Sequence, residues 1–310
     1  MDYDGDGILD VISGCYDPGD IFLSRGLGKG KYGPFEPIRD KKGTGLVHHP
    51  EEYRRYESER TPGKAEGNDL LMLRVASFGS WPATVDWDAD GDLDMLIGSF
   101  AGRLYLRTNE GTRTKPAYAA TAVEVKADGS PLDVGGHCNP VVADWDADGR
   151  WDLVVGAHDG SVSWYRNIGK PGTPAFGPRQ TLVDAKAKMK FVTHYLQPGE
   201  SGGPGVRSQI CVTDYDGDGR LDLLLGDYAK VVALRELDAS EEAVLARLQQ
   251  EVEDLRDEIL ARQTAGEAIE DLQAAYKSNF ESQKQFHAEG IAEQTVSHVW
   301  LYKRKSAVDF

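Results

Sequence analysis

One nine-residue pattern occurs four times in this chain and limits its fold more than any other feature. In each copy aspartate stands at positions 1, 3, 5 and 9, glycine at position 6, an aromatic residue at position 2 and an apolar residue at position 8. The clearest copy runs from Asp144 to Asp152. One such pattern is a weak signal, but four copies with shared flanks are a strong one. The candidate metal ligands are the aspartates of the four loops: Asp2, Asp4, Asp6, Asp10, Asp86, Asp88, Asp90, Asp94, Asp144, Asp146, Asp148, Asp152, Asp214, Asp216, Asp218 and Asp222.

The spacing of these carboxylates points to a bound cation. Alternate side chains bring several oxygens to one side of a tight turn, the glycine permits a positive φ, and position 7 can add a backbone carbonyl. Carboxylates this close repel one another strongly unless a cation lies among them. Hard oxygen ligands without cysteine or histidine favour Ca²⁺ over a transition metal, so we expect about one Ca²⁺ per loop, up to four, in a structural role.

The loop differs from the EF-hand, which needs a bidentate glutamate at position 12 and a helix on each side. Position 12 holds no glutamate in any copy; it is Ser13, Ile97, Val155 or Leu225. Each loop is followed instead by a short apolar run that closes on glycine: Val11–Gly14, Met95–Gly98, Leu153–Gly156 and Leu223–Gly226. Short runs of this kind are typical of buried strands, so each loop is predicted to join the strands of a β-hairpin.

The loops belong to a longer repeat. They begin at residues 2, 86, 144 and 214, so successive starts are 84, 58 and 70 residues apart. The 58-residue step aligns Pro82–Tyr118 with Pro140–Phe176 without a gap. Each unit reads as strand, loop, strand, turn, strand and an Asn-x-Gly turn, the size of a propeller blade. The predicted fold class is therefore all-β, a β-propeller of four visible four-stranded blades.

Two of the steps carry extra residues. The first surplus surrounds Gly43–Asp69, a charged stretch that contains His48 and His49 and is predicted to be a long exposed loop. The second lies in Gln197–Gly205, which is rich in glycine and proline and predicted to be a flexible loop.

A helical stretch from about Ala239 to Glu289 interrupts the fourth unit. Its apolar residues follow a 3-4-3-4 spacing, break at Thr264–Gly266 and then resume: Leu245, Leu248, Val252, Leu255, Ile259, Ile269, Leu272 and Tyr276. This heptad spacing predicts two helices of about 20–25 residues in an antiparallel hairpin or coiled coil. Val299–Arg304 then resembles the third strand of the third unit. The expected domains are 1–238 (blades), 239–289 (inserted helical hairpin) and 290–310 (a return strand that completes the last blade).

Composition limits the kinds of partner that the chain is expected to bind. The formal net charge is −16, from 51 acidic and 35 basic residues, which argues against nucleic acid. No apolar run approaches the ~18 residues of a membrane span. The three cysteines are too few and too scattered for a disulfide framework, so buried free thiols are expected. No signal peptide is visible, and Met1 directly precedes the first loop, so we expect an N-terminally truncated fragment.

The repeated loop, the apolar strand after it and the Asn-x-Gly turn resemble FG-GAP/VCBS-type repeats, most clearly at Asp86–Gly111 and Asp144–Gly169. The last unit is similar to the large VCBS-repeat proteins of environmental bacteria, planctomycetes especially. The resemblance implies β-propeller blades with Ca²⁺ in the loops, as in integrin α-subunit heads. It also implies export, so that the protein is secreted, periplasmic or at the cell surface. Related blades serve in adhesion, in carbohydrate binding and in some polysaccharide lyases, so the resemblance implies no single activity.

Two functions remain open at this stage. The first is a non-enzymatic, calcium-stabilised scaffold that binds a protein or polysaccharide, with the helical hairpin as a self-contained pair or as an arm for partner binding or dimerisation. The second is a carbohydrate-active enzyme of the lyase type, for which His48-His49 and Tyr53–Tyr56 share one loop without forming a compact catalytic set. No catalytic residue is predicted. The aromatic residues of the third strands are expected in the core rather than on a sugar-binding surface, and His137 and His194 are candidates to line a central pocket.

Overall fold

The computed structural model describes residues 1–59, 78–186, 193–198, 200–265, 267–289 and 293–305. The chain divides into two compact units, and each is described by itself. Unit 1 comprises Met1–Lys190, Pro204–Tyr228 and Ser297–Phe310, and unit 2 comprises Phe191–Gly203 and Ala229–Val296. Most of the regular structure is β-strand. No helix among the described residues has the length and apolar character needed to span a bilayer.

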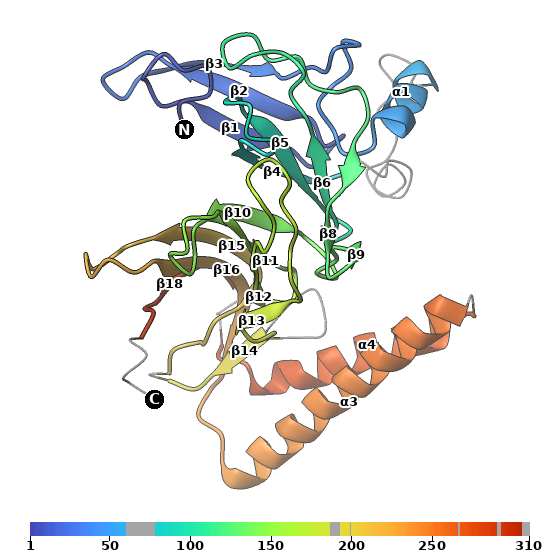
Figure 1. Cartoon of the computed structure of the whole chain (residues 1–310). Coiled ribbons are helices and arrows are strands. Elements are labelled where there is room, and N and C mark those ends of the chain that lie inside the picture. Colours follow the sequence, from blue (N-terminus) through green and yellow to red (C-terminus); the bar gives the residue numbers. More distant parts are fainter. Residues whose placement is uncertain (60–77, 187–192, 199, 266, 290–292, 306–310) are drawn as a thin grey trace. The chain divides into compact units, whose positions relative to one another are not determined.

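Unit 1 consists of successive antiparallel sheets, in chain order (Figure 1). The first sheet is β1 (Val11–Gly14), β2 (Ile21–Gly26) and β3 (Tyr32–Pro37). The second is β4 (Ser80–Val85), β5 (Asp94–Ser99), β6 (Leu104–Arg107) and β7 (Val123–Glu124). The third is β10 (Asn139–Ala143), β11 (Asp152–Gly156), β12 (Val162–Tyr165) and β13 (Gln180–Val183). A two-stranded ribbon, β8 (Lys126–Ala127) and β9 (Ser130–Pro131), lies between the second and third in sequence.

The fourth sheet is built on the long strand β16 (Asp222–Ala233), which belongs to both units. Its first half pairs with β15 (Val206–Thr213) and with β18 (Val299–Tyr302) in unit 1. Leu223 lies opposite Tyr302, as Leu153 lies opposite Tyr165 in the third sheet. Strand β18 therefore takes the place in the fourth sheet that β12 takes in the third.

The glycines that close the apolar runs mark where one sheet touches the next. A Cβ on Gly98 would lie 1.8 Å from the carbonyl oxygen of Cys138, and one on Gly14 would lie 2.0 Å from that of Ser80. No side chain fits in that space, so glycine is required wherever the first strand of the next sheet passes. The repeated glycine is thus a contact between sheets as well as a strand end.

Apolar clusters fill the space between consecutive sheets of unit 1. One contains Ile21 and Met95 from the first and second sheets, the next Leu96 and Leu153 from the second and third, and another joins Val154 to the fourth sheet. The third-strand tyrosines Tyr105 and Tyr165 are buried as well. The third-strand aromatics therefore contribute to the core, as the sequence indicated.

The prediction of an exposed loop at Gly43–Asp69 is wrong over its described part. Leu46, Val47 and His48 are almost fully buried, and α1 (Pro50–Glu59) follows them. The fully buried Arg107 draws this segment inward, because its guanidinium donates to the Val47 carbonyl at 2.6 Å and to Asp40 at 2.9 Å. Residues 60–69 lie outside the described part of the chain.

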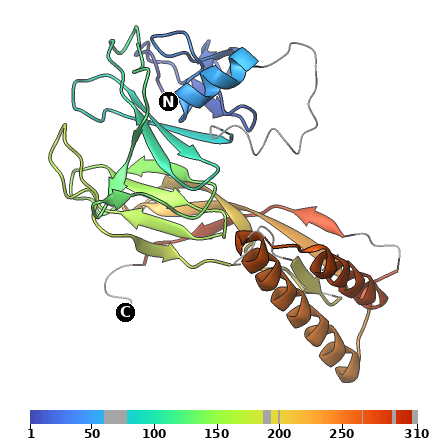
Figure 2. The ribbon, with the colours of Figure 1, turned by 90° about the vertical axis from the view of Figure 1, so that its right-hand side faces the viewer.

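Unit 2 contains β14 (Thr193–Leu196), β17 (Gln294–Val296), α3 (Ala239–Ala265), α4 (Glu270–Gln283) and the 3₁₀ turn Lys284–Phe286. Strand β14 pairs in parallel with the second half of β16 and ends directly before the predicted flexible loop Gln197–Gly205. The two helices lie side by side and run in opposite directions, since Glu251 meets Asn279 and Arg262 meets Asp271 (Figure 2).

The helices differ in length from the sequence-based expectation. Helix α3 has 27 residues and α4 only 14. Helix α3 begins where Asp238 accepts backbone hydrogen bonds from Ser240 and Glu241, an N-cap. Helix α4 ends early because the chain turns to bury Phe286 beside Val232, Leu234 and Leu245.

Candidate metal centre

Three of the four aspartate loops lie at hairpin turns, as the sequence predicted. The second, third and fourth loops join β4 to β5, β10 to β11 and β15 to β16, all antiparallel pairs. The glycine at position 6 has φ between 83° and 93° in all four loops: Gly7, Gly91, Gly149 and Gly219. A side chain rarely adopts that conformation, which explains glycine at this position.

The same glycine holds the first aspartate inside the turn. Its N–H donates to Oδ2 of the position-1 carboxylate at 2.9–3.2 Å in every loop. In three loops other backbone N–H groups also reach Oδ1 of that carboxylate, on Asp2, Asp144 and Asp214. The loop backbone therefore orients the carboxylate before any ligand is considered.

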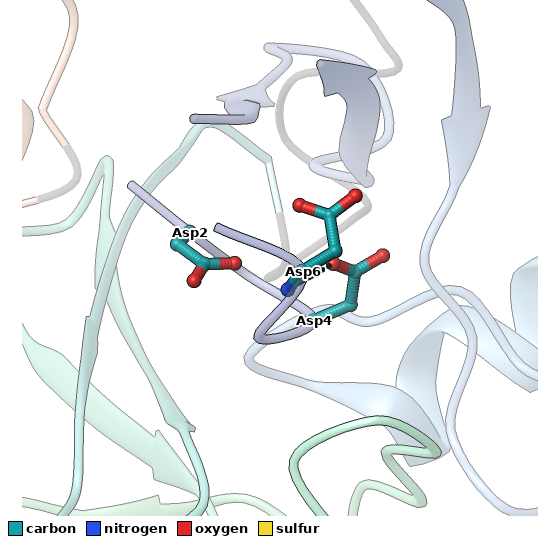
Figure 3. A group of neighbouring side chains, drawn as sticks. All are labelled: Asp2, Asp4 and Asp6. Carbon is teal, nitrogen blue, oxygen red and sulfur yellow. Dashed lines mark hydrogen bonds between the residues drawn. The ribbon is translucent and has the colours of Figure 1, made fainter. Parts of the chain in front are cut away.

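Four groups of carboxylates converge, one in each loop. In each group one oxygen per residue lies within 4.8 Å of the others. The groups are Asp2, Asp4 and Asp6; Asp86, Asp88 and Asp90; Asp144, Asp146 and Asp152; and Asp214, Asp216 and Asp218. Figure 3 shows the first group, in which Asp6 N donates to Asp4 Oδ1 at 3.3 Å. The third group contains Asp152 in place of Asp148, which pairs with Arg150 and Arg166.

The aspartate at position 9 has a different environment. In all four loops it is at most 5 % exposed, and it accepts a backbone N–H from the end of the neighbouring strand β2, β6, β12 or β18. These aspartates are Asp10, Asp94, Asp152 and Asp222. In Asp94 the second oxygen accepts the N–H of Trp87 at 2.9 Å. Burial raises the pKa of Asp94 to about 6, although these backbone donors oppose the rise. Three of these aspartates lie outside the converging groups, so position 9 fastens the loop to the sheet.

The oxygens of these groups fit a hard divalent cation. Asp86 Oδ1 and Asp146 Oδ1 are buried, and neither has a hydrogen-bond partner among the described residues. A buried carboxylate oxygen without a partner is costly, and a cation among the three carboxylates would remove that cost. Each described group consists of carboxylates alone, which is the ligand set that Ca²⁺ prefers. Positions 1, 3 and 5 would hold the ion in three loops, and positions 1, 3 and 9 in the third.

Comparison with known proteins shows which repeat family the sheets resemble. The profile of the FG-GAP-like repeat matches residues 86–155 and 144–225. The chain carries FG-GAP-like repeats. It is also similar to cartilage acidic protein 1 of Xenopus tropicalis, with 29% identity over 154 residues. That alignment covers 49% of this chain and 21% of the relative, so the chain spans about a fifth of that protein.

A basic side chain accompanies three of the four aspartate loops. The residue directly after each aspartate loop pairs with a residue of the neighbouring strand β2, β6, β12 or β18. The residue that follows this partner is Arg25, Thr108, Arg166 or Lys303. Each basic member pairs with the position-3 aspartate of its loop: Arg25 with Asp4, Arg166 with Asp146 at 2.6 Å, and Lys303 with Asp216 at 3.1 Å.

The second loop has threonine at this position. Among the described residues, no basic side chain pairs with Asp86, Asp88 or Asp90. The sequence does not single out these basic residues, because their place beside the loop depends on the register between strands. The pattern that could have found them is an arginine or lysine at the equivalent position of three repeats.

The residues considered for lyase chemistry have structural partners. The Tyr53 hydroxyl donates to Asp20 Oδ2 at 3.0 Å, and Arg54 donates to Thr44 and approaches Asp40. His49 lies 3.1 Å from the Tyr105 hydroxyl, and burial lowers its pKa. Cys138 is buried as expected, but Cys211 is exposed and Cys15 half-buried, and all three are free thiols. His137 lines a cavity in unit 1, whereas His194 belongs to unit 2.

Proposed function

We propose that this chain is a calcium-stabilised β-propeller segment that acts as a binding scaffold outside the cytoplasm. The observation that carries the proposal is the recurrence of a carboxylate group directly before a strand in four successive sheets, at the hairpin turn in three of them. A cation at each turn would neutralise the repelling carboxylates and fix the turn against the third strand. Calcium then has a structural role, and the surfaces between the turns are left for a ligand.

The proposed architecture treats the four sheets as blades. Residues 1–238 form the blades, 239–289 are a helical hairpin inserted into the last blade, and 290–310 return to complete it. The matching register of β12 and β18 supports this division. The ligand is a protein or a carbohydrate, and the helical hairpin is a candidate arm for a partner or a second copy.

Placement outside the cytoplasm agrees with the chemistry of the loops. Extracellular calcium modules bind at about 10⁻⁴–10⁻³ M, which suits compartments rich in Ca²⁺. The FG-GAP-like repeats support the same placement.

The deciding experiment is a thermal melt of the full chain with Ca²⁺, with Mg²⁺ and with EDTA, together with metal content per chain. We expect a Ca²⁺-specific rise in Tm and about three to four bound ions, because a site at 100-fold saturation adds about 2.7 kcal/mol to the folded state. An Asp88→Asn/Asp90→Asn variant should bind one ion fewer. If no ion binds and Tm does not change, the calcium role is wrong.

A further inference from the structure

A cavity of about 640 Å³ lies in unit 1 where one strand from each of the four sheets contributes to its wall: β1, β4, β10 and β15. Small-molecule sites occupy about 300–1,000 Å³, so the cavity has the size of one. Trp81, Asn139 and Gln209 occupy equivalent places in this wall, because each pairs with the glycine that closes the apolar run of its sheet. The repeat itself therefore brings these three side chains to one surface.

Two aromatic rings form one part of the wall. Tyr16 and Trp81 meet edge to face, with ring centroids 5.9 Å apart and an angle of 84° between the planes. Trp81 also stacks on His137 with centroids 5.1 Å apart. Tyr16 remains 49% exposed although Phe78 and Phe100 contact it as well. An exposed aromatic ring that its neighbours hold in place is a surface on which another ring can stack.

Two side-chain amides form another part of the wall, and each orients the other. Asn139 Nδ2 donates to Gln209 Oε1 at 2.6 Å. This bond leaves Asn139 Oδ1 as an acceptor and Gln209 Nε2 as a donor, and neither atom has another partner among the described residues. A hydroxyl group both donates and accepts, so an acceptor beside a donor suits two neighbouring hydroxyl groups.

The charged residues of the wall are satisfied within the protein. Among the described lining residues they are Arg207 and Asp227, one of each sign. Arg207 stacks over the Tyr228 ring at 4.7 Å from its centroid. The buried Asp227 carboxylate keeps its negative charge and accepts three hydrogen bonds, two from backbone N–H groups and one from the Trp300 indole. The wall thus offers no free cation to an anionic ligand, and the chain as a whole carries −16.

Backbone hydrogen bonds between the first and second sheets hold the aromatic part in position. Gly79 N donates to the Tyr16 carbonyl at 2.7 Å, and Ser80 N donates to the Cys15 carbonyl at 3.2 Å. These bonds tie Tyr16 to the strand that carries Trp81. A wall that is ordered before the ligand arrives lowers the entropy cost of binding.

We propose that this cavity binds a neutral saccharide. One sugar ring lies against Tyr16 and Trp81, and two neighbouring hydroxyl groups of the sugar bond the free amide atoms of Asn139 and Gln209. A ring with apolar C–H faces and hydroxyl edges matches this combination of aromatic rings and amides, and a neutral ligand needs no charged partner. The proposal rests on the proposed scaffold function and chooses carbohydrate over protein as the ligand.

Calorimetric titration of the full chain in saturating Ca²⁺ tests the ligand class. The probes are mannotetraose and cellotetraose, each compared with the uronate tetramer of the same linkage, which differs in carrying carboxylates at C6. We expect at least one neutral tetramer to bind at least about tenfold more tightly than its uronate, because the carboxylates would meet Asp227 without a free cation. The proposal is overturned if neither neutral tetramer binds, or if a uronate binds as tightly as its neutral counterpart.

The variant Gln209→Glu tests the amide pair. Glutamate keeps the size of the side chain and the acceptor for Asn139, but it replaces the donor that faces the ligand and adds a charge. Binding of the neutral tetramer should weaken at least about tenfold. The matched control is Gln180→Glu, an exposed amide of β13 outside the cavity lining, which should leave binding unchanged.

The variant Tyr16→Ala tests the aromatic surface and should weaken binding about tenfold. Its control is Tyr32→Ala, because Tyr32 is also 49% exposed but does not line the cavity. Unchanged binding in both Gln209→Glu and Tyr16→Ala would reject the site.

The Ca²⁺-dependent rise in Tm is measured on the same samples. A retained rise without saccharide binding rejects the ligand class alone, whereas its loss rejects the scaffold function.

Discussion

The aspartates of one loop divide into two roles. Positions 1, 3 and 5 converge on a point that a cation can occupy, while position 9 turns its oxygens to backbone N–H groups of the loop and the third strand. All four are the same residue type, so the sequence grouped them together as ligands. The sequence feature that separates position 9 from the other three aspartates is that it begins a buried strand.

Substitutions at these two kinds of position should separate the roles. In EDTA at pH 7.5, where the Asp94 carboxylate is ionised, Asp94→Asn should lower the free energy of unfolding by about 2–3 kcal/mol, because the amide N–H₂ then faces one of the two backbone donors, which loses its acceptor. Asp86→Asn should cost less in EDTA but lose part of the gain from Ca²⁺. Urea denaturation with and without Ca²⁺ measures both. Equal losses in EDTA would contradict the division.

The basic residue beside three loops predicts unequal calcium affinities. Arg166→Gln removes a half-exposed cation from Asp146 and should raise the affinity of the third loop about two- to fivefold, the range for an exposed ion pair. Thr108→Arg, the reverse change, should lower the affinity of the second loop. Calcium titration by calorimetry measures both variants. A rise in affinity with Thr108→Arg would show that these side chains do not compete with the ion.

At the scale of elements, strands were predictable and the packing around them was not. The closing glycine and the apolar run marked β5 and β11 to within a residue, because both follow a local pattern. The segment from Asp40 to Val47 looked like a charged loop, since its burial depends on Arg107, which is distant in sequence. The early end of α4 likewise depends on where Phe286 packs.

The Arg107–Asp40 pair should be essential to that segment. Both side chains are fully buried, and Arg107 also donates to the carbonyls of Ala119 and Val47. Arg107→Met leaves a buried carboxylate without its partner and should cost about 3–5 kcal/mol in urea denaturation. Arg103→Met, directly before the same strand, breaks an exposed pair with Glu124 and should cost clearly less. Similar costs for the two variants would show that burial of the pair contributes little.

At the scale of the whole molecule, the candidate metal sites and the helices belong to different units. The described carboxylate groups all belong to unit 1, while α3 and α4 belong to unit 2. In the sequence, the corresponding contrast is the change from a repeated loop to a heptad spacing. It did not reveal the cavity, which forms only when positions from successive repeats are brought together by the sheets.

Calcium should therefore stabilise unit 1 selectively. The six tryptophans, Trp81, Trp87, Trp145, Trp151, Trp164 and Trp300, are all in unit 1, so their fluorescence reports its unfolding, while circular dichroism at ~222 nm reports mainly α3 and α4. Saturating Ca²⁺ should raise the fluorescence midpoint by about 5 °C or more, since one filled site adds about 2.7 kcal/mol and each kcal/mol shifts Tm by about 2–4 °C. The helical midpoint should move less. Equal shifts would mean that β16, which runs through both units, makes them unfold as one cooperative structure.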